Sequence, residues 1–250
     1  MIKIIAVKYL NTLPFVHGIE ESGILQDYLL ELDIPSNCAL KLENGEADIG
    51  LVPIAALENL KDYHVFGDYC IGALNSVGSV LLLADKPIEE LTEIYLDYQS
   101  NTTNLLIQVI CNKYLNMFPL WINGEEGFEE NINEYKGGIV IGDRAFALRD
   151  KFNYQYDLAT LWNEHTDLPF VFACWVAKST VSPKILERFN AALSWGVEHK
   201  HAAIKDTEID IDLDYYFEKS ISYEFDAPKK QAMELYLSEI RSLNPPEPTR

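Results

Sequence analysis

The sequence predicts an α/β protein folded as two lobes, with a ligand cleft between them. Short apolar strands alternate with helical segments, which is typical of an α/β sheet with mainly parallel pairing. A second β-α-β module, from Ile94 to Gly142, is bracketed by two apolar strands that would cross between the lobes. The chain has 250 residues, of which 48% are hydrophobic and 24% charged, enough for a substantial core.

The first elements follow from local patterns. The β-branched run Ile2–Val7 predicts a buried strand, and Pro14 stands in the loop that opens the first helix. The elements expected next are a helix over Pro35–Leu42 ended by Gly45, a strand over 47–52, a helix over 54–60, strands over 65–73 and 79–84, a helical turn over 87–91 and a strand over 94–97.

In the second half, Ser100 to Thr103 predict a helix N-cap before the amphipathic run 105–115. We then expect a strand over 139–142, a helix over 145–149, a strand over 170–177, a long helix from Pro183 to about His201, a last helix over 229–243 and an extended proline-rich tail. Residues 1–84 and 176–250 are assigned to a discontinuous first lobe, and residues 85–175 to the second.

The net charge of −19 disfavours nucleic acid and an anionic membrane surface as partners. A small anionic ligand would need a local site of helix N-termini and a few cations. The first residues resemble a strand more than a signal peptide, and no apolar run approaches the ~20 residues of a bilayer span. Without CxxC pairs, the cysteines Cys38, Cys70, Cys111 and Cys174 are expected to be buried free thiols, and the location cytoplasmic.

Familiar chemical motifs are missing from the sequence. GxGxxG, GxxxxGK[ST], HExxH and GxSxG do not occur, and the five histidines lack a metal-ligand spacing. We therefore expect neither a cofactor nor a metal. In α/β sheets ligands gather where strands end, which points to the loops after Val7, Val52, Asp97 and Ile141.

Four segments carry candidate site residues, each with a structural alternative. Asn11 could bind a ligand or cap the next helix. Ser76 and Ser79 could face the cleft or cap backbone groups. The run from Ser100 to Thr103 could bind a carboxylate or form an ordinary N-cap. Arg144 could clamp a carboxylate or pair with Asp143 or another neighbour, and Lys8 is a second cation. These alternatives stay open on the sequence alone.

Several segments, in this order, resemble the menaquinone-biosynthesis family of the futalosine route, closest to its chorismate dehydratases. They are YLNTLPF at Tyr9, GEADIGLVP at Gly45, SVLLLA at Ser79, SNTT at Ser100, IGDRA at Ile141 and LWNEHTDLPFVFACW at Leu161. The resemblance implies a two-lobed fold of the type II periplasmic-binding-protein kind. It also implies a hydro-lyase reaction, in which chorismate loses water to give 3-[(1-carboxyvinyl)oxy]benzoate.

The resemblance assigns the catalytic positions to Asn11 and Ser79. Substrate binding is expected from Tyr9, Lys8, Ser76, Ser100, Asn101, Thr102, Thr103, Asp143 and Arg144. The chain departs from the family's pattern at four places. Asn101 stands where the family has an arginine, Asp167 where it has a glycine, and Asn75-Ser76 where it has a glycine-proline pair. Lys8 stands where a smaller or neutral residue is expected. Lys8 could compensate for the missing arginine.

Three other functions are compatible with the sequence. A non-catalytic small-anion binding protein would share the fold, because a fold does not determine a function. A sister enzyme acting on a later, cyclised intermediate of the pathway would also share it, although the YLN loop fits the dehydratase better. A structural partner protein is the third alternative.

Overall fold

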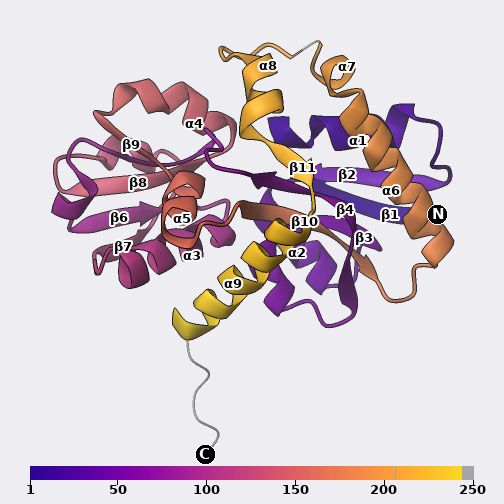
Figure 1. Cartoon of the computed structure of the whole chain (residues 1–250), viewed down its shortest axis with the longest axis horizontal. Helices are drawn as coiled ribbons and strands as arrows, with labels where there is room; N and C mark the ends of the chain where they lie inside the picture. Colours follow the sequence, from indigo (N-terminus) through magenta and orange to yellow (C-terminus); the bar gives the residue numbers. More distant parts are fainter. Residues whose placement is uncertain (206, 244–250) are drawn as a thin grey trace, which may run out of the picture. The chain divides into compact units, whose positions relative to one another are not determined.

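Figure 1 shows a computed structural model that describes residues 1–205 and 207–243. The chain divides into two compact units. Unit 1 comprises residues 1–73 and 171–226, and unit 2 comprises residues 74–170 and the segment that begins at Ala227. The extended tail predicted after Leu243 lies outside the described residues. In the part of the chain that is described, every helix is either too short or too polar to cross a lipid bilayer.

Unit 1 contains a six-stranded sheet in the order β11-β4-β10-β3-β1-β2. β1 is parallel to β2 and β3, whereas β10 is antiparallel to β3, and β11 to β4. Its elements are β1 (Ile2–Val7), α1 (Leu13–Glu21), β2 (Tyr28–Asp33), α2 (Pro35–Glu43), β3 (Ile49–Pro53), β4 (Tyr63–Ala73), β10 (Phe170–Lys178), α6 (Pro183–Glu198), α7 (Lys200–Ile204), α8 (Leu213–Tyr215) and β11 (Ser222–Glu224).

Unit 2 contains a five-stranded sheet in the order β7-β6-β8-β5-β9. β6 is parallel to β7 and β8, and β5 is antiparallel to β8 and β9. Its elements are β5 (Val80–Ala84), β6 (Glu93–Leu96), α3 (Asn101–Val109), β7 (Leu120–Asn123), β8 (Lys136–Ile141), α4 (Asp143–Leu148), β9 (Tyr154–Asp157), α5 (Leu158–Thr166) and α9 (Ala227–Leu243).

The α/β class is confirmed, but the expectation of mainly parallel pairing is wrong, because both sheets are mixed. The predicted lobe boundaries also differ from the observed units. β5 belongs to unit 2 because both of its partner strands lie there. α9 belongs to unit 2 as well, where Tyr236 packs edge-on against the rings of Trp162 and Phe170. Helical periodicity identifies an apolar face but not the surface that this face covers.

Other differences have local causes. The helix predicted from Pro183 to His201 ends at Glu198, where His199 Nδ1 lies 2.7 Å from the Trp195 carbonyl oxygen, and α7 begins anew. The helix predicted over 54–60 is a 3₁₀ helix, Ile54–Glu58. Local sequence patterns did not indicate β2, β7, β9, β11 or α5. The four strands are short, three to six residues, and all four lie at the edges of their sheets.

The core of unit 1 forms around Phe15, which is fully buried. Its ring meets Trp175 at 5.7 Å and Tyr223 at 5.1 Å, both edge-on. This edge-to-face geometry contributes about 0.5–1.5 kcal/mol per pair beyond area burial. The cluster joins α1, β10 and β11, so it holds the loop after β1 against the sheet.

α1 and α6 run side by side in unit 1 and pack at two glycines (Figure 1). An added Cβ at Gly18 would lie 2.1 Å from the Ala192 carbonyl oxygen, and one at Gly196 would lie 2.0 Å from that of Pro14. Both obstacles are backbone atoms, which cannot turn away as a side chain can. The close crossing of these helices therefore requires glycine at both positions.

Gly18→Ala tests this packing through the sign of its effect. Helix propensity alone predicts a gain of about 1 kcal/mol in the free energy of unfolding. Steric overlap with α6 predicts a loss of about 1–3 kcal/mol instead. We expect the loss, measured by urea denaturation, and an unchanged or increased stability would contradict the close crossing.

Candidate functional site

The candidate residues of unit 2 gather at one edge of its sheet. β6 and β8 are parallel, so their carboxyl ends lie at the same edge. β5 is antiparallel to β8 with Val80 opposite Ile141, and β9 is antiparallel to β5 with Asp157 opposite Leu81. This register places the start of β5 and the end of β9 at that edge. The segments brought together there are 76–79, 97–103, 142–144 and Asp157.

Ser79 stands at the start of β5 and is 1% exposed. Its carbonyl oxygen accepts a hydrogen bond from the Gly142 N–H at 2.8 Å, which joins it to the loop before α4. Ser76 is exposed, and its hydroxyl donates to Asp157 Oδ2 at 2.8 Å. This bond goes to a side chain of unit 2, whereas the capping alternative expected a bond to a backbone group.

The segment 100–103 begins α3 as predicted. The Ser100 Oγ accepts from the Thr103 N–H at 3.4 Å and lies 3.1 Å from the Thr103 hydroxyl. Thr102 is buried, and its carbonyl oxygen accepts from the Tyr236 hydroxyl at 2.8 Å. Asn101 is exposed. An ordinary N-cap thus accounts for Ser100 and Thr103.

Arg144 is engaged by two carboxylates of its own unit. Its guanidinium pairs with Asp97 through Nη2 and with Glu129 Oε1 through Nη1, the latter at 2.6 Å. It also lies over the Tyr98 ring, 4.7 Å from the centroid. The predicted alternative of an internal ion pair is observed, with partners other than Asp143, which is exposed. The cluster holds one positive and two negative charges, so the guanidinium faces carboxylates of the protein itself in this structure.

Asp97 is the buried member of this cluster, with a side chain that is 0% exposed. Burial raises the pKa of the Asp97 carboxyl above its usual value, and the Arg144 guanidinium opposes that rise. Its Oδ1 accepts from the Gln99 N–H at 2.8 Å, which shapes the turn that leads into α3. Asn104 completes the turn by bonding both the N–H and the carbonyl of Asp97 at 2.8 Å. Sequence reasoning missed these two roles.

The candidate residues of unit 1 follow β1. Lys8 is exposed, and its N–H donates to the Asp33 carbonyl oxygen at 2.8 Å. Tyr9 and Asn11 are half-buried in the 3₁₀ turn before α1. The Thr12 hydroxyl donates to Asn11 Oδ1 at 3.4 Å, which leaves the amide NH₂ as the donor end. The Tyr223 hydroxyl donates to the Asn11 carbonyl oxygen at 2.8 Å. Tyr223 had no signal in the sequence, because β11 is only three residues long.

No cluster of three or more His, Cys, Asp or Glu side chains that could hold a metal ion occurs within residues 1–205 and 207–243. The four cysteines are free and buried, as predicted. Burial raises the pKa of the Cys38 and Cys111 thiols to about 12, so neither is a thiolate nucleophile at neutral pH.

Comparison with known proteins gives a consistent result. A family described as "Menaquinone biosynthesis" matches residues 2–242. A chorismate dehydratase from Campylobacter jejuni is 25% identical over 248 residues, covering 95% of this chain and 97% of the relative. A chorismate dehydratase from Thermus thermophilus is 28% identical over 196 residues, covering 70% and 69%.

The solved structures establish the fold. A Candida albicans protein described as having the generic periplasmic binding protein fold superposes with a TM-score of 0.68 at 11% identity, covering 100% of this chain and 92% of that one. The predicted periplasmic-binding-protein-like fold is therefore confirmed.

Arg144→Met tests the charge balance at Asp97. The variant leaves a buried carboxylate without its cation, and we expect the free energy of unfolding to fall by about 3 kcal/mol at neutral pH. Without the cation, the pKa of Asp97 rises further above that of the unfolded chain. The folded state then binds a proton that the unfolded state lacks, so stability decreases as pH rises between the two pKa values. Relative to wild type, the loss should be smaller at pH 5 than at pH 8 in urea denaturation.

Glu129→Gln is the matched control for Arg144→Met. It removes the second, less buried carboxylate and leaves the Arg144–Asp97 pair intact. A loss below about 1 kcal/mol and no pH trend are expected. Equal losses in the two variants would contradict the assignment of Asp97 as the charge that Arg144 compensates.

Proposed function

This chain belongs to the menaquinone-biosynthesis family, and we propose that within it the protein is a chorismate dehydratase. The reaction removes water from chorismate and gives 3-[(1-carboxyvinyl)oxy]benzoate. The observation that carries the proposal is the match over nearly the whole chain to a relative of that name. The futalosine route, the hydro-lyase class and a cytoplasmic location stay predictions that accompany it.

Chorismate carries two carboxylates on a cyclohexadiene ring. Loss of a ring proton and the adjacent hydroxyl makes the ring aromatic, so the reaction is strongly downhill. The protein's task is then to orient the substrate and to handle one proton. Neither of the two assigned catalytic positions is a strong base, because the Asn11 amide and the Ser79 hydroxyl cannot by themselves deprotonate carbon. We infer that the enolpyruvyl carboxylate of the substrate takes the ring proton and passes it to the departing hydroxyl, which leaves as water.

In this mechanism Asn11 and Ser79 orient the reacting groups. The Asn11 amide donates a hydrogen bond to the carboxylate that accepts the proton, and the Ser79 hydroxyl supports the departing hydroxyl. The Asn11 amide is suited to this role because the Thr12 hydroxyl bonds its oxygen and Tyr223 fixes its backbone. The first turn of α3, with Asn101, would hold the ring carboxylate in place of the already paired Arg144.

The substrate assignment is tested by incubating the purified protein with chorismate. The aromatic product should appear as a new ultraviolet absorbance and be identified by mass as chorismate less one water. Binding of chorismate in calorimetry without turnover would favour the non-catalytic binding protein. The absence of both would favour the sister enzyme that acts on a cyclised intermediate.

Asn11→Ala tests the catalytic assignment. Loss of one oriented donor should lower kcat about 100-fold while KM changes little, because the bond is proposed to strengthen in the transition state. Asn44→Ala is the control, since Asn44 is exposed at the end of α2 and outside every candidate segment. Equal losses in kcat and in affinity would contradict the role given to Asn11.

A further inference from the structure

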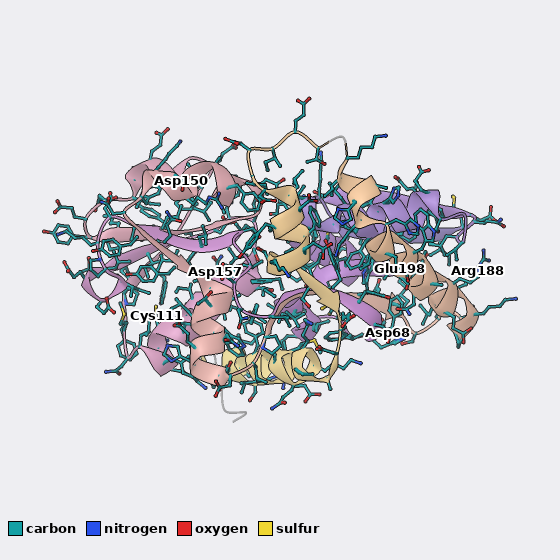
Figure 2. The ribbon with its side chains drawn as sticks, turned by 45° about the horizontal axis from the view of Figure 1, so that its top comes forward. Asp68, Cys111, Asp150, Asp157, Arg188 and Glu198 are labelled. Carbon is teal, nitrogen blue, oxygen red and sulfur yellow. The ribbon has the colours of Figure 1, made fainter. Side chains whose placement is uncertain are left out.

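Asp157 is the most heavily bonded carboxylate at the sheet edge of unit 2. Oδ1 accepts from the N–H groups of Ala159 and Thr160 at 3.0 and 3.1 Å, which caps α5. Oδ2 accepts from the Val77 N–H at 2.9 Å, the Gly78 N–H at 2.6 Å and the Ser76 hydroxyl. Figure 2 labels this side chain at the start of α5. One oxygen thus serves the helix, and the other serves a loop about 80 residues earlier in the chain.

The loop 76–78 directs three hydrogen-bond donors at the Asp157 carboxylate. Gly78 has a φ of +70°, so the consecutive N–H groups of Val77 and Gly78 point to one side and form a small anion-binding concavity. A capping aspartate ordinarily needs only one of its oxygens for the helix. The three further donors on Oδ2 are therefore not explained by capping α5.

Ser79 follows this loop directly and is fixed on both sides. On one side, the N–H of the preceding Gly78 donates to Asp157. On the other, the carbonyl oxygen of Ser79 accepts from the Gly142 N–H. The hydroxyl of a buried serine in such a segment keeps its direction only as long as the loop keeps its shape. A misplacement of about 1 Å in a group that acts in the transition state can lower the rate about 100-fold.

We propose that Asp157 is a positioning residue that holds the loop 76–78 and thereby orients Ser79 toward the substrate. The inference rests on the proposed chorismate dehydratase activity, and it adds a residue that does not touch the substrate itself. Asp157 acts on the loop through two N–H groups and one hydroxyl and does not contact the substrate. Its loss should therefore lower kcat, through the orientation of Ser79, rather than weaken substrate binding.

Asp157→Ser separates the two functions of the side chain. Serine remains a good N-cap for α5. Its side chain is shorter and has a single oxygen, so it cannot bond the helix and also reach the loop 76–78. Asp212→Ser is the matched control, because Asp212 caps α8 through the Tyr215 N–H at 2.9 Å in unit 1, at no candidate segment. Both variants are measured for chorismate turnover, for thermal midpoint and for amide hydrogen exchange.

The expected result is a fall in kcat of about tenfold or more for Asp157→Ser, with KM within about twofold of wild type. Amide exchange should accelerate at Val77 and Gly78 but not at Ala159, Thr160 or within β8. Asp212→Ser should leave kcat unchanged. Faster exchange throughout β5 and β8 would instead mean general loosening of unit 2 and would overturn a specific positioning role.

The wild-type measurement separates this proposal from the proposed function. If wild-type protein fails to convert chorismate, the dehydratase assignment is wrong whatever Asp157 does, and exchange at Val77 and Gly78 alone decides whether Asp157 holds the loop. If wild type is active and Asp157→Ser keeps its full kcat, the positioning role is wrong and the dehydratase assignment stands.

Discussion

Backbone N–H groups at the ends of buried strands must find acceptors, and in unit 2 two carboxylates meet this requirement at one sheet edge. Asp97 accepts from the Gln99 N–H beyond β6, and Asp157 accepts from Val77 and Gly78 before β5. Arg144 connects the first carboxylate to the start of α4. The loops that carry the candidate residues are therefore shaped by charged groups of the protein itself, before any ligand is present.

Two buried tyrosines donate hydrogen bonds to backbone carbonyl groups beside the candidate residues. Tyr223 of β11 donates to the Asn11 carbonyl in unit 1, and Tyr236 of α9 donates to the Thr102 carbonyl in unit 2. Burial raises the pKa of both tyrosines above the usual value, so both hydroxyls keep their protons and serve as donors. Because the ring of each tyrosine is packed and its hydroxyl is hydrogen-bonded, each tyrosine fixes the backbone of a segment that carries candidate side chains. The C-terminal part of the chain thus serves both units, although only its helical pattern was visible in the sequence.

The sequence was sufficient where a single local rule decides the structure. The hydroxyl of Ser100 before an amphipathic run predicted the cap that the Thr103 N–H confirms. β11 could not be predicted in this way, since its three residues depend on pairing with β4, about 150 positions earlier. Asp157 could have been recognised as the cap of α5, because it directly precedes an amphipathic segment. Its bonds to residues 76–78 depend on the register of β5 against β9, and no local pattern contains that register.

The charge distribution gives a chemical reason for the proposed positioning of Ser79 by Asp157. The protein carries a net charge of −19, and Arg144, the expected cation, is already shared by Asp97 and Glu129. In the proposed dehydratase reaction, the doubly negative chorismate would therefore be met in unit 2 mainly by neutral donors, the N–H groups at the start of α3 and the hydroxyl of Ser79. A neutral donor binds an anion more weakly than a positively charged group does. It is therefore most effective when it is already oriented before the anion binds, because no entropy is then lost in ordering it. In the proposed role, the carboxylate of Asp157 reduces this entropic cost in advance, so an internal negative charge would be useful even at a site for an anionic substrate.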